Sequence, residues 1–246
     1  MRTHLSVVLV AALAGMASAA IIQDDFEGYG SQQDFEAAWP LTGTNAMAWT
    51  ADNSHSPTHS VFSNGDLARR HYRNFGSAVT PTNEQPLIAE FWMTVPETNN
   101  NARQYCEVRG YAGGAYNSGA LNELYAIGLY NGITNPGNHF QARVAFGGPN
   151  WINLDLAGAP TRTPGWHRFT VEMLGAGVIN FYVDGTLSGT VTDTSPTPLD
   201  DFILGSGLTS NPTAPQSSYY DDVLVQVVPE PAALALLALG FVLRRR

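Results

Sequence analysis

The sequence predicts an all-β fold over residues 20–227, an antiparallel β-sandwich, and three observations predict it. Short runs rich in β-branched and aromatic residues recur along this stretch, separated by Gly, Pro, Asn, Ser and Thr. Several runs alternate apolar and polar residues with period two, which is typical of half-buried strands. No stretch has a convincing helical period, and residues 33–39 are expected to form one helical turn at most.

The expected strands follow one another at short intervals. In chain order they cover 86–95, 103–111, 123–131, 139–146, 151–156, 166–174, 178–185 and 218–228. Asp184-Gly185 lies between two strand-like runs, and this dipeptide favours the positive φ values of a tight hairpin turn. Gly175-Ala176-Gly177 marks the preceding turn, so residues 166–192 are predicted to form a three-stranded meander.

Both ends of the chain differ from the middle. Residues 1–19 combine a basic start, an apolar run and an Ala-Ser-Ala cleavage pattern, which is the layout of a secretory signal peptide. Residues 228–246 contain a Pro-Glu-Pro triplet, twelve apolar residues and three arginines. A spanning helix needs about 20 apolar residues, so a permanent anchor is the weaker of two interpretations. The domain itself is expected to occupy residues 20–227.

The middle of the chain is strongly acidic. It has eight arginines, no lysine and twenty Asp plus Glu residues, a formal net charge of −12. Such a surface repels nucleic acid and anionic lipid, so neither is expected as a general partner. Its single cysteine, Cys106, excludes an internal disulfide and is predicted to be buried as a small apolar side chain.

The meander carries a family resemblance. The string GWHRFTVEMLGAGVINFYVDGTLSGT resembles the core of the concanavalin A-like lectin/glucanase jelly roll, a superfamily that includes laminin G-like domains. The opening IIQDDFEGY and the closing YYDDVLVQ resemble the first and last strands of such domains. The resemblance implies a jelly-roll fold. It does not specify an activity, because this fold hosts lectins, hydrolases, lyases and inert modules.

The C-terminal segment resembles a second family signature, the PEP-CTERM sorting signal of Gram-negative bacteria. The residues that carry this resemblance are Pro229, Glu230, Pro231, Arg244, Arg245 and Arg246. It implies export by the general secretion machinery and processing by an exosortase-type membrane protease. The protein would then reach the cell surface or extracellular matrix after only transient membrane contact. The two prolines keep the junction extended, which suits protease recognition.

Acidic residues near the two ends of the domain predict a possible calcium site. The first and last strands of a sandwich are commonly neighbours, so Asp25, Glu27 and Asp222 are expected to approach one another. Ca²⁺ binds six to eight oxygen atoms, and a domain without disulfides benefits from such a structural cation. The alternative is a solvated acidic edge that discourages edge-to-edge pairing of strands.

One predicted strand places a polar stripe on a single face. Its residues are Arg103, Tyr105, Glu107 and Arg109. The arginines suit a uronate carboxylate and the tyrosine suits stacking, an arrangement that jelly-roll polysaccharide lyases use. Any half-exposed antiparallel strand also shows a polar face, so both interpretations stay open. A second group of arginines is expected to pair with the acidic surface, and an anion-binding strip is the alternative; these residues are Arg69, Arg70 and Arg73.

Aromatic residues near turn signals are candidate sugar platforms, since aromatic faces stack on pyranose C–H groups. These candidates are Trp39, Trp49, Tyr111, Tyr116 and Trp151, whereas Trp92 and Trp166 are assigned to the core. The sequence lacks the Glu-x-Asp-x-x-Glu spacing of the superfamily's glucanases and any Gly-x-Ser-x-Gly or His-Glu-x-x-His motif. The predicted function is therefore carbohydrate binding. A jelly-roll polysaccharide lyase or glycoside hydrolase, or a structural matrix protein, is the alternative.

Overall fold

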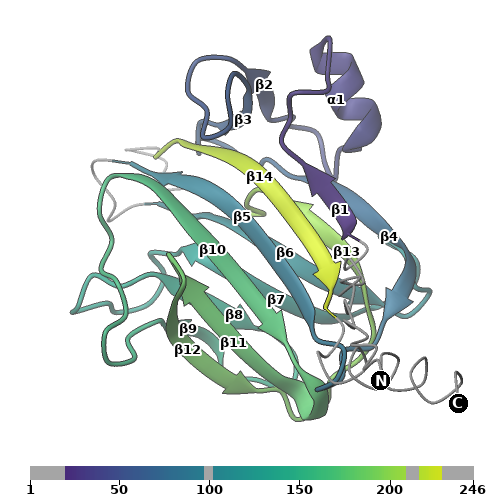
Figure 1. Cartoon of the computed structure of the whole chain (residues 1–246), viewed down its shortest axis with the longest axis vertical. Helices are drawn as coiled ribbons and strands as arrows, with labels where there is room; N and C mark the ends of the chain where they lie inside the picture. The colour runs from purple at the N-terminus through teal and green to yellow at the C-terminus, as the bar shows by residue number, and fades with distance from the viewer. Residues whose placement is uncertain (1–19, 97–101, 209–215, 229–246) are drawn as a thin grey trace, which may run out of the picture.

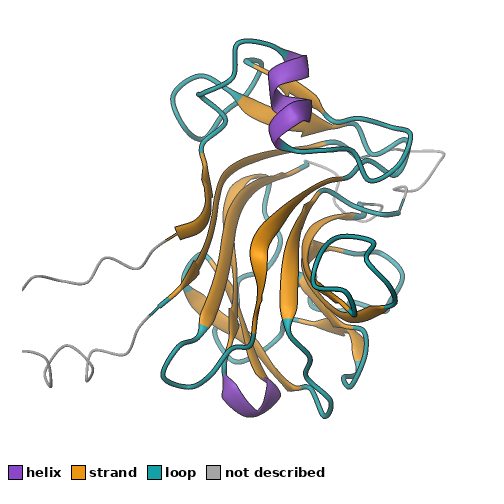
Figure 2. Cartoon of the chain, turned by 90° about the vertical axis from the view of Figure 1, so that its right-hand side faces the viewer, coloured by secondary structure: helices purple, strands orange, loops and turns teal. Residues whose placement is uncertain are grey.

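Two antiparallel sheets face each other in the computed structural model, which describes residues 20–96, 102–208 and 216–228 (Figure 1, Figure 2). This confirms the predicted β-sandwich. The signal-peptide and sorting-signal predictions lie outside the described residues. The eight-stranded sheet has the order β12-β11-β10-β5-β14-β3-β2, with β1 also paired to β14. The six-stranded sheet has the order β4-β13-β6-β7-β8-β9.

The strand bounds follow the predicted runs closely. The eight-stranded sheet contains β1 (Ala20–Asp24), β2 (Ala48–Thr50), β3 (Ser60–Ser63), β5 (Leu87–Val95), β10 (Gly165–Met173), β11 (Val178–Val183), β12 (Thr186–Thr192) and β14 (Ser218–Val227). The six-stranded sheet contains β4 (His71–Val79), β6 (Gln104–Tyr111), β7 (Leu121–Leu129), β8 (Gln141–Val144), β9 (Asn150–Asn153) and β13 (Leu199–Leu204). The sequence did not reveal β2, β3, β4 or β13, which are short or interrupted by charged residues and glycine.

The meander of β10, β11 and β12 forms as predicted. Asp184 and Gly185 have φ values of 51° and 79°, so both positions of the turn use the positive φ that this dipeptide tolerates. The Asp184 carboxylate also accepts the Arg168 backbone N–H at 2.9 Å, which ties the hairpin to the start of β10.

One helix, α1 (Gln32–Ala38), is longer than the single turn predicted from the sequence. Ser31 caps it by accepting the Asp34 N–H, and Phe35 is buried against Phe26 and His71. These contacts stabilise a helix too short to persist alone. Within the described ranges, no helix has both the length and the apolar character needed to cross a membrane.

The core between the sheets is built from aromatic and aliphatic side chains. Phe91 stacks on Phe169 with ring centroids 5.3 Å apart, and Phe140 meets Phe169 edge-on at 5.1 Å. Each such buried side chain contributes about 1.5–3 kcal/mol relative to exposure. Cys106 lies in this core as predicted, and burial raises the pKa of its thiol, which makes it inert.

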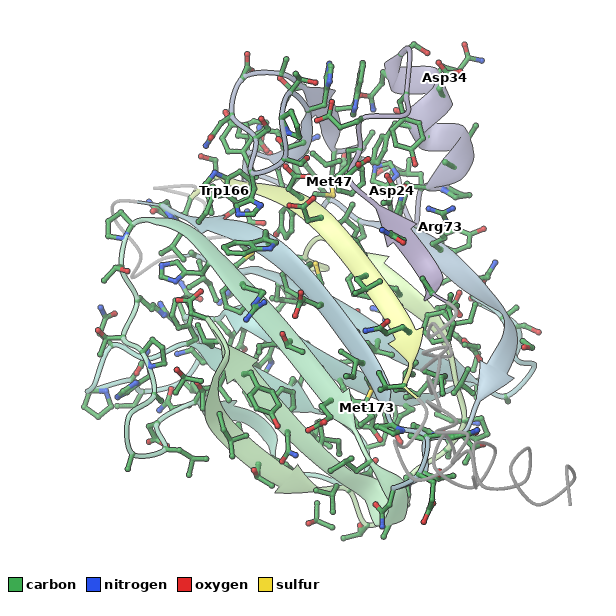
Figure 3. All side chains as sticks on the ribbon, in the orientation of Figure 1. Asp24, Asp34, Met47, Arg73, Trp166 and Met173 are labelled. Carbon is green, nitrogen blue, oxygen red and sulfur yellow. The ribbon has the colours of Figure 1, made fainter. Side chains whose placement is uncertain are left out.

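The first and last strands are neighbours, as expected. In the pairing of β1 with β14, Ala20 lies opposite Gln226. At the other end of β1, Asp24 accepts hydrogen bonds from Arg73 at 2.9 Å, Trp39 at 2.8 Å and Tyr29 (Figure 3). This carboxylate therefore fastens the segment containing α1 to both sheets.

Candidate ligand-binding face

The outer face of the six-stranded sheet collects polar and aromatic side chains from every strand. In β6, Cys106 and Val108 point into the core, so the alternate residues of the predicted stripe point outward. Cross-strand pairing places residues of the other strands beside them. We name this surface the arginine face and define it by Arg70, Tyr72, Arg103, Tyr105, Glu107, Arg109, Tyr111, Tyr116, Tyr130, Arg143 and Trp151.

The centre of the arginine face is a buried ion pair. Arg109 donates from Nε to Glu107 at 2.6 Å and from Nη1 to the Tyr111 hydroxyl at 2.9 Å. Glu107 and Arg109 are only 3% and 7% exposed. Burial lowers the pKa of Arg109, but the charge of Glu107, the charge of Tyr111 and the hydrogen bonds to both side chains together outweigh it, and the net shift is upward. The pair therefore stays charged and contributes no net charge to the face.

Tyr105 lies beside this pair and is also buried. Burial and the negative charge of Glu107 raise the pKa of Tyr105 to about 12. A phenol with this pKa is a poor base at neutral pH, where the ideal catalytic pKa is near 7. The stripe predicted from the sequence thus lies on one face, but the Glu107 carboxylate is ion-paired with Arg109.

Three further arginines surround the centre of the arginine face. Arg70 and Arg143 are half-buried, and within the described residues neither lies in ion-pair distance of an acidic side chain. Arg143 donates to Asn150 at 2.8 Å and lies 5.8 Å from the Trp151 ring centroid. Arg103 donates to Asn131 at 2.6 Å and lies over the Tyr130 ring. The face is therefore positive, although the domain is strongly acidic.

By contrast, two arginines pair with the acidic surface as the sequence predicted. Arg69 contacts Asp66 at 3.1 Å and Arg73 contacts Asp24 at 2.9 Å. Arg70, between them in the sequence, contacts no carboxylate among the described residues, so the prediction that it pairs with the acidic surface is wrong. Strand alternation explains the difference, because Tyr72 and Arg70 point to the outer face whereas His71 and Arg73 point to the other side.

Aromatic rings line the arginine face in two groups. Trp151 stacks on Tyr130 with centroids 4.0 Å apart and meets Tyr105 edge-on at 5.2 Å. Tyr116 stacks on Tyr72 at 4.2 Å and lies 5.6 Å from Tyr111. The predicted platforms Trp151, Tyr111 and Tyr116 are therefore brought together. The sequence patterns did not identify Tyr72 or Tyr130 as candidates. Each lies next to a polar residue near the end of a strand, which is the signal that could have found them.

The two other predicted platforms lie outside the arginine face. Trp39 is fully buried and donates to Asp24, because the segment containing α1 folds over it, so the prediction of an exposed stacking surface is wrong for Trp39. Trp49 is half-buried, donates to the Phe26 carbonyl at 2.9 Å and stacks on His59. Its role as a platform stays a prediction.

Trp92 and Trp166 were assigned to the core, and this prediction is also wrong. Phe91 and Met93 point inward from β5, so Trp92 points to the outer face of the eight-stranded sheet. His55 stacks on Trp92 with centroids 3.7 Å apart and meets Trp166 at 5.7 Å. Figure 3 shows Trp166, which lies at the start of β10.

The acidic residues proposed for calcium divide into two places. Asp25 and Asp222 line a hollow of about 380 Å³ on the eight-stranded sheet, together with Glu90 and Trp92. Glu27 instead accepts the backbone N–H groups of Thr58 and His59. Desolvation raises the pKa of Glu27, but these hydrogen bonds outweigh it and bring the pKa to about 2. No group of three His, Cys, Asp or Glu side chains suited to a metal occurs in the described ranges.

A hydroxyl group nevertheless lies among an excess of oxygen acceptors. Ser56 Oγ is 3.0 Å from the Asp25 carbonyl oxygen, 3.0 and 3.1 Å from the Asp221 carboxylate oxygens and 3.5 Å from Glu27. Backbone N–H groups already donate to both carboxylates. A hydroxyl has one hydrogen to donate, so its own lone pairs and those of the carbonyl oxygen stay open to a further ligand. Carboxylate, carbonyl and hydroxyl oxygens are the ligands that Ca²⁺ prefers, and this set fits the ion.

Asp221 was missed because β14 does not alternate regularly there. The register shifts between Asp221 and Leu224, and Asp222 has a φ of 48°. The bulge turns the buried Asp221 toward Ser56 and places Asp222 against His55, with Oδ2 and Nδ1 2.5 Å apart. Simple alternation along β14 therefore selects Asp222, whereas the structure places Asp221 beside Ser56.

Comparisons with known proteins establish the fold alone. No protein-family model matches the sequence, and the search of curated proteins finds no match. Among solved structures, the chain is similar to the globular domain of T. cruzi calreticulin, with a TM-score of 0.55 and 9% identity over 89% of this chain and 92% of that one. It is also similar to a cellulose-induced protein, Cip1, with a TM-score of 0.52 and 15% identity over 83% and 96% of the two chains. A sialidase matches with a TM-score of 0.51 and 13% identity over 87% of this chain but 19% of its own. The fold is an antiparallel β-sandwich of the jelly-roll type.

Proposed function

We propose that the chain is a carbohydrate-binding module whose arginine face takes an acidic polysaccharide. The observation that carries this proposal is that Arg70 and Arg143 lack a carboxylate partner among the described residues, and that Arg143 lies beside the stacked rings of Trp151 and Tyr130. A guanidinium group binds a sugar carboxylate through two parallel hydrogen bonds, each worth about 1.5–3 kcal/mol when one partner is charged. Trp151 and Tyr116 supply faces on which sugar rings stack.

A polysaccharide lyase or glycoside hydrolase is the alternative on the same face. Both need a group that gives or takes a proton near neutral pH. Tyr105, with its pKa raised to about 12, and Glu107, bound to Arg109, are poorly suited to that task. Binding without turnover is therefore favoured over catalysis. A structural matrix protein without a small ligand remains the third class.

Binding titrations with polygalacturonate, alginate and a neutral glucan test the proposal. We expect the acidic polymers to bind and Arg143→Ala to weaken them about tenfold or more, since one charge-assisted hydrogen bond is lost. Arg168→Ala, on the opposite sheet, is the matched control and should leave affinity unchanged. Release of unsaturated uronate would favour the lyase. Absence of binding to every polymer would favour the structural class.

We extend this proposal to cellular location. Residues 1–19 direct export, and the Pro-Glu-Pro segment at 229–231 directs processing by an exosortase-type protease, which leaves the module at the cell surface or in the extracellular matrix. Intact-mass measurement of the protein from its producing cells tests this. The expected mass lacks both terminal segments, and a mass of the whole chain contradicts the proposal.

The calcium prediction also becomes a specific proposal. The carbonyl oxygen of Asp25 and the carboxylates of Glu27 and Asp221 would hold the ion around Ser56, and the bound ion would tie β1 to β14 and to the segment before β3. Such a cation stabilises the fold and takes no part in binding polysaccharide.

A further inference from the structure

Two adjacent buried carboxyl groups at one end of the arginine face leave three of their four oxygens without a hydrogen-bond donor among the described residues. Asp200 and Asp201 are 1% and 0% exposed. Both carboxylate oxygens of Asp201 and Oδ1 of Asp200 have no hydrogen-bond partner among the described residues. The remaining oxygen, Oδ2 of Asp200, accepts the Tyr111 backbone N–H at 2.8 Å. Buried polar atoms without partners are rare in folded proteins and require an explanation.

An irregular strand pairing brings the two groups together. Leu199 pairs with Val79 but Asp201 pairs with Asn74, so the register of β13 against β4 shifts between them. The neighbouring carboxyls then interact although they follow one another in a strand. Burial and the Asp200 carboxyl raise the pKa of Asp201 to about 8. Uncompensated carboxylates in such a place cost several kcal/mol, so a proton or a cation must neutralise them.

The nearest protein cation does not neutralise this pair. Arg109 lies opposite Asp201 in the pairing of β6 with β13. Its guanidinium group is committed to Glu107 and to the Tyr111 hydroxyl, and its charge is balanced by Glu107. Its attraction lowers the pKa of Asp201 only in part.

A second buried carboxyl pair in the same molecule shows what a proton-sharing pair looks like. Glu123 accepts the backbone N–H groups of Leu124 at 3.1 Å and Thr197 at 3.3 Å. Asp193 accepts the Tyr125 hydroxyl and the Ser195 N–H, each at 2.8 Å. Neither Glu123 nor Asp193 leaves a buried oxygen without a partner in the described ranges. The carboxyls of Asp200 and Asp201 also share a hydrogen bond, and the Tyr116 N–H lies near Asp201. Three of the four oxygens of this pair nevertheless have no donor at hydrogen-bond distance in the described ranges, which distinguishes it from the pair of Glu123 and Asp193.

We propose that Asp200 and Asp201, with the side-chain oxygen of Asn74, bind a divalent cation of the Ca²⁺ class. All of these donors are hard oxygen atoms, which select Ca²⁺ or Mg²⁺ over transition metals. Asn74 is the cross-strand partner of Asp201, so its amide lies on the same face. This site is separate from the one around Ser56, which lies at the β1 and β14 edge of the other sheet.

The cation would also order the aromatic part of the arginine face. Asn74 Oδ1 accepts the Tyr116 N–H at 3.0 Å, and Tyr116 stacks on Tyr72. Asp200 holds the backbone of Tyr111. Two of the three proposed ligands, Asn74 and Asp200, thus hold the hairpin between β6 and β7. This second consequence, that polysaccharide binding depends on the cation, rests on the proposed function, whereas the cation site itself does not.

Thermal unfolding of a variant with only this site intact tests the proposal. Glu27→Gln with Asp221→Asn disables the site around Ser56. In that background, Ca²⁺ at about 100 times its dissociation constant should raise Tm by about 5–10 °C. Adding Asp201→Asn should abolish the shift and raise Tm in EDTA, because the amide can donate to Oδ1 of Asp200 and no second carboxyl then lies against it. Adding Glu123→Gln, which alters the other carboxyl pair, is the matched control and should leave the Ca²⁺ response intact.

Three results would overturn the proposal: no Ca²⁺ shift in the background variant, a shift that survives Asp201→Asn, or a lower Tm for Asp201→Asn in EDTA. If Asp201→Asn does not fold, Tb³⁺ luminescence of the background variant decides. Emission sensitised by the neighbouring tyrosines and displaced by Ca²⁺ supports the site, and its absence refutes it. None of these measurements uses a polysaccharide, so they stand or fall separately from the proposed function.

Discussion

Glu123 is expected to make the stability of the sandwich fall as the pH rises. It is fully buried, and burial raises the pKa of its carboxyl from an ordinary value of 4.5 to about 8, with the hydrogen bond to Asp193 and the charge of Asp193 adding to the shift. Below pH 4.5 the carboxyl is protonated whether the chain is folded or not. Between pH 4.5 and 8 only the folded chain keeps the proton, so stability is lost progressively until Glu123 ionises.

The size of the effect follows from the shift. A difference of about 3.5 pKa units at about 1.36 kcal/mol per unit gives about 5 kcal/mol as an upper value. Coupling to Asp193 and relaxation of the buried pair reduce this to an expected loss of about 3–5 kcal/mol between pH 5 and 9. Domains of this kind unfold with about 5–15 kcal/mol, so the loss is a large part of the total. Tm should fall by about 10 °C over the same range.

Urea unfolding of the wild type and Glu123→Gln across this pH range measures the effect. Glutamine has the same shape, carries no charge at any pH and can still donate to Asp193. The difference between the two pH profiles therefore isolates Glu123 from every other titrating group. Glu84→Gln, at an exposed position, is the control and should reproduce the wild-type profile. Parallel profiles for wild type and Glu123→Gln, within about 0.5 kcal/mol, would refute the reasoning.

Two further predictions concern the arginine face and the edge of the other sheet. Glu107→Gln should lower the free energy of unfolding by about 3–5 kcal/mol, because Arg109 keeps a buried charge without its partner. The paired change Glu107→Leu with Arg109→Met should recover most of that loss in the same denaturation assay, and failure to recover it would argue against a charge effect. Removal of Ca²⁺ with EDTA should lower Tm, and Glu27→Gln with Asp221→Asn should reduce the response to the part that the Asp200 and Asp201 site contributes. An unchanged melting curve in EDTA would contradict the calcium proposal.

The general fold could be predicted because its signals are local. Alternation along 166–173 and the Asp184-Gly185 turn depend on residues next to one another, and both appear in the structure. The outward stripe on β6 follows from the same alternation. β13 was not found because Asp200 and Asp201 interrupt an apolar run, and only tertiary packing makes that segment a strand.

The site was predicted in part, because its remaining features depend on register. Trp92 lies in a nearly continuous apolar run, which does not say which residues face outward. The bulge in β14 makes Asp221, and not Asp222, approach Glu27. Among the described residues, Arg70 and Arg143 have no carboxylate within ion-pair distance. This depends on how the strands assemble, and no spacing in the sequence predicts it.

The pairing of Ala20 with Gln226 has a geometric consequence. The first and last described strands lie side by side in the eight-stranded sheet, so both ends of the domain leave from the layer that is turned away from the arginine face (Figure 1). A domain held to a support through either end points its basic surface outward, toward the medium. The attached end and the proposed polysaccharide-binding face would then lie on opposite sides of the domain, so attachment would not obstruct binding.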